Sequence, residues 1–151
     1  MAASEEVSLE SSVRKLFERY ERLFNQALAG DVNLDDVASL YAAEFIAASP
    51  AGVMSGKNDA QLRAAMAQGH AHYRAIGTKE MRIREVRLSP IDDLHCVAHV
   101  AWSSTYARRD RPDVTIDFVV SYFVQAVGGE PKVFGWVSGD EQAALKEHGV
   151  I

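Results

Sequence analysis

The chain has 151 residues, of which 48% are hydrophobic and 25% charged, proportions typical of one soluble globular domain. Its net charge of −5 argues against a nucleic-acid partner, because phosphate binding draws on a positive surface. The single cysteine, Cys96, excludes an intrachain disulfide and a multi-thiolate metal site. The sequence shows no secretory signal and no membrane-spanning run, so we expect a cytoplasmic protein without a membrane partner.

The first half of the chain carries helical periodicity. Apolar residues at three- and four-residue steps predict a long helix over 13–28, followed by a short helix over about 35–41. Two short extended pieces are expected over 45–49 and 53–56. A third helix is predicted from about 59 to 76. Helices therefore dominate this half.

The second half changes to a period of two. Segments 79–89, 94–107, 114–127 and 132–138 are rich in Val, Ile, Trp, Tyr and Phe, and turn residues separate them. A capping-box pattern opens a last short helix over about 140–148. This order predicts a four-stranded antiparallel meander.

Helices followed by a meander indicate an α+β fold and not alternating βαβ units. Strands of this length must twist and curl, which creates a concave face that the first helix can cover. We therefore expect a cone-shaped, cystatin-like curved sheet wrapped on a long N-terminal helix. The whole chain, 1–151, is expected to be one domain with residues 1–8 frayed.

Short motifs add a family resemblance to this pattern. The helix end at Ala29-Gly30-Asp31, the turn at Ser49-Pro50-x-Gly52 and the Ser55-Gly56 pair resemble the nuclear-transport-factor-like superfamily, in its SnoaL-like and ketosteroid-isomerase-like branch. The likeness runs from about Val13 to Ser138. It implies a pocket for a small hydrophobic molecule and no metal or other cofactor.

The comparison with ketosteroid isomerase concerns three catalytic parts, a general base and an oxyanion hole of one tyrosine and one protonated aspartic acid. Ser49 stands where that enzyme has its base, which makes steroid isomerisation improbable here. The tyrosine position falls on Leu23, with Tyr20 about one helical turn away. The resemblance carries the aspartic acid onto Asp117, in Thr115-Ile116-Asp117-Phe118.

Asp117 interrupts an otherwise apolar strand, where an unpaired buried charge is costly. A functional interpretation places it on the concave face as an acid, base or hydrogen-bond donor with a pKa raised by burial. A structural interpretation places it on the convex face, solvated or paired with Arg82 or Arg84. The sequence leaves both open.

Strand parity connects this choice to a partner. If Asp117 points inward, then Ile116, Phe118, Val120 and Tyr122 form an outer apolar face that needs cover. We therefore expect a homodimer through the convex sheet face. If the parity is reversed, Trp102, Phe118 and Tyr122 fill the interior instead.

The other candidate residues are polar or aromatic positions near the expected cone. His70 shares a helical face with Tyr73 and is a candidate acid or base at the pocket mouth, although the spacing favours a packed, hydrogen-bonded pair. No metal site is expected, because the histidines are not spaced as ligands of one ion. Residues expected to line the pocket are Tyr20, Tyr41, Ser49, Met66, Tyr73, Trp102 and Ser121.

The function expected from these residues is binding or transformation of a small hydrophobic, cyclic metabolite. If the protein is an enzyme, metal-free proton transfer of the isomerase, dehydratase or cyclase type is expected, with Asp117 and His70 catalytic. The alternative is a non-catalytic dimerising module that binds a ligand or a protein.

Overall fold

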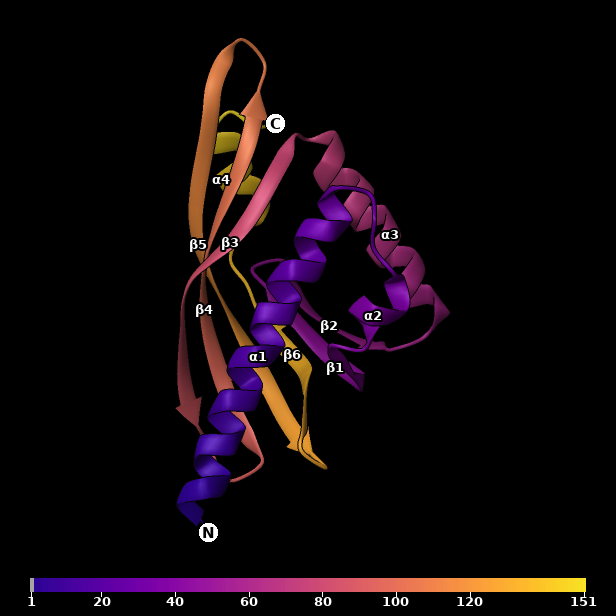
Figure 1. The fold of residues 1–151 in the computed structure, drawn as a ribbon. Coiled ribbons are helices and arrows are strands. Elements are labelled where there is room, and N and C mark those ends of the chain that lie inside the picture. The colour runs from indigo at the N-terminus through magenta and orange to yellow at the C-terminus, as the bar shows by residue number, and fades with distance from the viewer. Residues whose placement is uncertain (1) are drawn as a thin grey trace.

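The protein is described by a computed structural model that covers residues 2–151, with side chains from residue 9 onward (Figure 1). The sequence predicted that residues 1–8 are frayed. The side chains of these residues lie outside the described part of the structure, so the expectation stays a prediction. The helices are α1 (Ala2–Leu28), α2 (Leu34–Ala38), α3 (Ala60–Ala75) and α4 (Glu141–Glu147). The strands are β1 (Tyr41–Ser49), β2 (Gly52–Lys57), β3 (Thr78–Pro90), β4 (His95–Arg108), β5 (Arg111–Val127) and β6 (Glu130–Val137).

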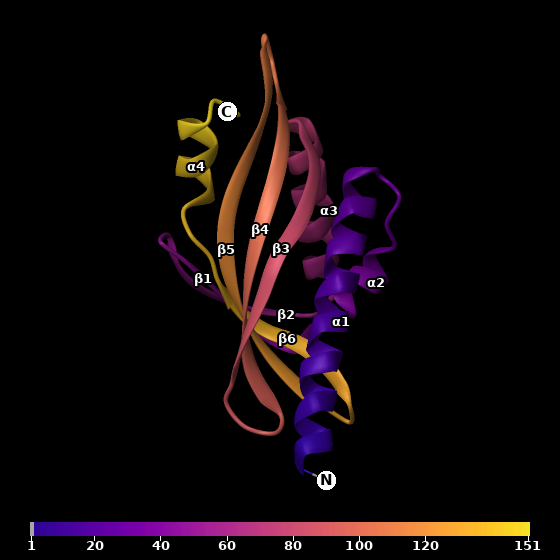
Figure 2. The same cartoon turned by 60° about the vertical axis from the view of Figure 1, so that its left-hand side comes forward.

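One curved six-stranded sheet has the order β2-β1-β6-β5-β4-β3. The predicted α+β architecture and the four long strands are confirmed. The sheet is larger than the expected meander, because the two short extended pieces pair with each other and β1 joins β6 in parallel. Figure 2 shows how strongly the sheet twists, since the upper parts of β3, β4 and β5 run at a wide angle to β6, while the lower part of β5 lies beside β6.

Helix α1 packs along the inner face of the sheet through the apolar stripe seen in the sequence. Val13 and Phe17 are fully buried, and the ring of Phe17 lies 4.9 Å from that of Tyr122 on β5. Alternate residues of β4, from Cys96 through Trp102 to Tyr106, face the same core. Burial of this apolar surface is the main force that holds the helix on the sheet.

The edge strand β3 is covered by polar side chains of α1. Asn25 makes two hydrogen bonds with the backbone of Met81, donating to its oxygen at 2.7 Å and accepting from its nitrogen at 3.0 Å. Glu21 accepts from the nitrogen of Ile83, and Arg14 donates to the oxygen of Val86. These bonds occupy backbone groups that would otherwise invite a further strand.

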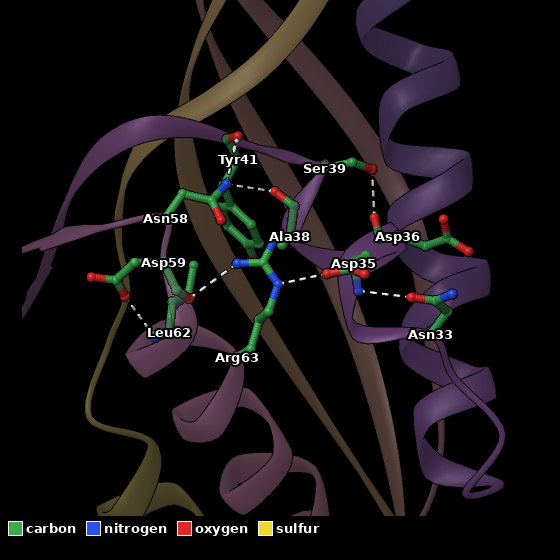
Figure 3. A network of polar contacts seen from close by, with 10 residues as sticks. All are labelled: Asn33, Asp35, Asp36, Ala38, Ser39, Tyr41, Asn58, Asp59, Leu62 and Arg63. Atoms are coloured by element: carbon green, nitrogen blue, oxygen red, sulfur yellow. Dashed lines mark hydrogen bonds and ion pairs between the residues drawn. The ribbon is translucent and has the colours of Figure 1, made fainter.

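A polar network joins α2, β1 and α3 (Figure 3). Asn58 donates to the backbone oxygens of Ala38 and Tyr41, at 2.8 and 3.2 Å. Arg63 lies 2.7 Å from Asp35, which links the start of α3 to α2. The network fixes the beginning of β1 and therefore the position of the Tyr41 ring.

Among the described residues, no helix combines the length and the apolar character needed to span a bilayer.

Candidate functional site

An inner pocket of about 420 Å³ lies between the inner face of the sheet and helices α1, α3 and α4. Its volume falls within the usual range for small-molecule sites. Apolar side chains, among them Met81 and Leu145, line part of its wall. Eight of the eighteen lining residues are aromatic: Tyr20, Phe24, Tyr73, Trp102, Tyr106, Phe118, Tyr122 and Trp136.

Four polar aromatic side chains form two hydrogen-bonded pairs beside this pocket. The indole nitrogen of Trp102 donates to the hydroxyl of Tyr122 at 3.1 Å. The hydroxyl of Tyr20 lies 2.9 Å from that of Tyr41, and the ring of Tyr20 packs against that of Tyr122 with centroids 5.5 Å apart. Neutral groups thus satisfy one another where water is largely excluded, as buried polar groups must.

Burial governs the titration of the three tyrosines. It raises the pKa of Tyr20, and it raises the pKa of Tyr41 and of Tyr122 well above the ordinary tyrosine value. In the bond between Tyr20 and Tyr41 either hydroxyl can be the donor, and the hydroxyl that accepts keeps its own proton for another acceptor. All three hydroxyls are neutral at pH 7.

The mouth of the pocket is closed in part by a contact between α3 and α4. The hydroxyl of Tyr73 donates to Glu141 at 2.7 Å. Burial, followed by the charge and the hydrogen bond of Glu141, raises the pKa of Tyr73 far above its usual range. Asp140, the N-cap of α4, accepts from the nitrogen of Ala143 at 2.9 Å. Leu145 of the same helix is buried with Tyr106 and Ile116.

The structure brings some of the predicted pocket residues together. Tyr20, Tyr73 and Trp102 all line the inner pocket. Tyr41 lies behind Tyr20, with its ring 6.2 Å away and its hydroxyl in hydrogen-bond contact. These four side chains come from α1, α3, β4 and β1, so only the folded sheet collects them.

Asp117 requires a correction. Its carboxylate is 58% exposed and lies on the outer face of β5, between Ser103, which donates to it at 2.6 Å, and Arg84 at 3.7 Å. The alternating burial of Ile116, Val120 and Tyr122 sets this parity, because these larger apolar side chains fill the core. The inward orientation expected for a catalytic Asp117 is not found, and the reversed parity holds.

Ser121 follows Asp117 onto the outer face, which corrects its expected place in the pocket. Its hydroxyl hydrogen-bonds the Nδ1 atom of His99 at 2.9 Å, and the Nε2 atom of that ring contacts Ser89 at 3.1 Å. Both residues lie on the opposite side of the sheet from Tyr122. The expected apolar outer face of Ile116, Phe118, Val120 and Tyr122 is likewise turned inward.

The remaining predicted site residues lie outside the inner pocket lining. His70 is buried beside Phe24, with the rings 6.1 Å apart; burial and then the charge of Arg74 lower its pKa. Met66 packs against the core. Ser49 ends β1, and its hydroxyl accepts from the nitrogen of Ala51 at 3.2 Å within the turn.

Sequence reasoning missed most of the lining residues, among them Tyr106, Phe24 and Glu141. Tyr106 follows Trp102 by four positions on β4, so strand parity could have placed both side chains on the same face. Phe24 follows Tyr20 by four positions on α1, which places both on one helical face. Glu141 carried no such signal, since a carboxylate in the first turn of a helix has an ordinary local role.

In the part of the chain that the structure describes, no three His, Cys, Asp or Glu side chains gather as a set that could hold a metal ion.

Comparisons with solved structures agree on the fold. An NTF2-like protein with a cystatin-like fold from Novosphingobium aromaticivorans is 13% identical, with a TM-score of 0.67 over 99% of this chain and 94% of that chain. A candidate scytalone dehydratase from the same organism is 10% identical, with a TM-score of 0.66 over 89% and 85% of the two chains. An NTF2-like protein of unknown function from Shewanella oneidensis is 14% identical, with a TM-score of 0.64 over 87% and 98%.

At such identities these neighbours establish the fold alone. No curated protein matches the sequence. The family described as NTF2-like protein (DUF6841) matches residues 8–141. This range includes eight of the ten helices and strands in whole and α1 and α4 in part, together with Tyr20, Tyr41, Trp102 and Tyr122. The chain therefore belongs to this NTF2-like family.

Proposed function

We propose that the inner pocket binds, or transforms by metal-free proton transfer, a small hydrophobic cyclic molecule that carries a carbonyl or hydroxyl oxygen. The observation that carries this proposal is the Tyr20 hydroxyl, which lies at the aromatic wall of the pocket and is held 2.9 Å from the hydroxyl of Tyr41. With Tyr41 as the donor in that pair, Tyr20 donates to a ligand oxygen without reorganisation and stabilises negative charge that develops there.

The chemistry that such a donor assists is enolisation, isomerisation or dehydration next to a carbonyl group. Two structural neighbours are described as candidate dehydratases, one from Novosphingobium aromaticivorans and one from Streptomyces avermitilis. With Asp117 on the outer face, Tyr20 replaces it as the proposed donor. His70 lies outside the pocket lining and is not part of the proposed site.

A matched pair of probes tests the Tyr20 hydrogen bond. 2-Acetylnaphthalene and 2-ethylnaphthalene have nearly the same shape, but only the first has a carbonyl oxygen. Quenching of Trp102 and Trp136 fluorescence reports their binding. We expect Tyr20→Phe to weaken binding of the ketone about five- to tenfold, the usual effect of one lost hydrogen bond.

The hydrocarbon serves as the internal control, because Tyr20→Phe leaves the apolar wall in place. Its affinity should change less than twofold. Equal losses for both probes would mean that the substitution altered the pocket and that Tyr20 donates to neither. Failure of both probes to bind the parent protein would reject the inner pocket as a small-molecule site.

The outer face of the sheet is proposed to hold a second copy of this chain. Two aliphatic residues support it, Val119 and Val137, which are 55% and 46% exposed beside the polar pairs of Asp117 and His99. Light scattering should give twice the chain mass, and Val119→Glu should give the single-chain mass. A parent protein with the mass of one chain would reject this pairing.

A further inference from the structure

The polar groups at the mouth of the inner pocket are acidic. Asp140 and Glu141 both line it and both are exposed. None of the described residues that line this pocket is a lysine, arginine or histidine. Asp117 is also among the residues that line the pocket, but its carboxylate does not count toward this charge, because it is bound on the outer face by Ser103 and lies beside Arg84.

The start of α4 offsets only part of this negative charge. A helix N-terminus is equivalent to roughly half a positive elementary charge, so two carboxylates leave a net charge of about −1.5 at the mouth. The hydrogen bond from Tyr73 holds the Glu141 carboxylate at this position. The excess charge is therefore fixed in place and belongs to the pocket.

The walls next to these carboxylates are aromatic. Tyr73 itself lines the pocket, and its ring lies 5.5 Å from Phe24. Trp136 lines the pocket as well and contacts Tyr41 at 5.6 Å between ring centroids. The face of an aromatic ring attracts a cation, most strongly where water is excluded. The rings and the carboxylates therefore both favour a positively charged ligand.

We infer that the inner pocket selects a hydrophobic ligand that carries a protonated amine, and that it discriminates against carboxylate-bearing ligands of the same shape. This inference rests on the proposed function that the pocket binds a small hydrophobic molecule, and it adds the charge class of that molecule. The ammonium group lies near Glu141 and Asp140, and the apolar ring fills the aromatic part of the pocket.

Three probes of one scaffold test the inference: 2-naphthylmethylamine, 2-naphthylmethanol and 2-naphthoate. Calorimetry at pH 7 should rank the amine above the alcohol and the alcohol above the carboxylate, by roughly tenfold at each step. Glu141→Gln should reduce the advantage of the amine over the alcohol about threefold. The variant can still accept the Tyr73 hydrogen bond, so the pocket keeps its shape.

Glu147→Gln is the matched control, because Glu147 is an exposed residue of the same helix that does not line the pocket. It should leave the ratio of the two affinities unchanged. An amine that binds no more tightly than the alcohol would overturn the inference, as would a ratio that Glu141→Gln does not alter. Tight binding of the alcohol in either case would leave the proposed function standing, whereas no binding by any probe would reject both.

Discussion

The two faces of the sheet carry different kinds of polar group, neutral and buried on the inner face and charged and exposed on the outer face. On the inner face, Trp102 and Tyr122 satisfy each other at 3.1 Å while both are buried. On the outer face, the neighbouring Ser103 and Asp117 form a half-exposed group with Arg84. Neutral hydroxyls occupy the interior and charges remain where water can solvate them, which follows from the cost of burying an ion. A charge within an apolar strand therefore does not by itself mark a binding site.

The largest expected difference in stability is between alanine substitutions on the two faces. Trp102→Ala removes a fully buried ring and the donor to Tyr122, so the free energy of unfolding should fall by about 3–5 kcal/mol. Ser103→Ala, one position along on the outer face, should cost less than about 1 kcal/mol. Urea denaturation followed by circular dichroism measures both. Similar losses in the two variants would contradict the assigned faces.

A smaller substitution isolates the hydrogen bonds of the inner face. Tyr122→Phe keeps the ring but leaves the Trp102 nitrogen without its acceptor, at an expected cost of about 1–3 kcal/mol. Urea unfolding of this variant measures the loss. Unchanged stability would show that the indole nitrogen has another partner.

The pH dependence of stability separates His70 from an exposed neighbour on α3. Burial lowers the pKa of His70, so protons bind the unfolded chain more tightly than the folded one. Its contribution to stability is complete above the ordinary histidine pKa and is lost as the pH falls below it. His70→Gln should reduce the difference in melting temperature between pH 7.5 and pH 5.5.

The matched control is His72→Gln, since His72 is exposed on the same helix. It should keep the full difference in melting temperature between the two pH values. An undiminished difference in His70→Gln would show that other groups dominate the acid response.

The smallest expected effect is that of Asp117→Asn. The carboxylate is 58% exposed, and exposed ion pairs contribute little, so stability should change by less than about 0.5–1 kcal/mol. Binding of either naphthalene probe should be unaffected. A clear loss of ketone binding with stability unchanged would show that the Asp117 carboxylate faces the pocket, and would contradict its position on the outer face of β5.

The sequence predicted the elements of the fold better than the orientation of one strand. Long β-rich segments and the helical stripe of α1 have strong periodicity, so their positions were confirmed. The parity of β5 was ambiguous, because Val119 and Phe123 alternate with Phe118 and Tyr122 and both sets contain apolar residues. The partner strand resolves it: Trp102 pairs with Phe118, and Ser103 with Asp117.

Two further features could not be predicted from local pattern. The pairing of β1 with β6 joins segments about 90 residues apart, and nothing in either short segment specifies its partner. The contact between Tyr73 and Glu141 likewise joins two helices that meet only at the pocket mouth. Long-range contacts of this kind form only in the complete fold.

The hydrogen bond from Tyr20 to the oxygen of a bound ketone is the central claim, and the carbonyl carbon of that ketone reports on it directly. 2-Acetylnaphthalene labelled with ¹³C at the carbonyl should show its resonance move downfield on binding, since a donated hydrogen bond draws electron density toward oxygen. Tyr20→Phe should abolish this shift while the ligand stays bound. A bound ketone with the same carbonyl resonance in the parent protein and the variant would contradict the account.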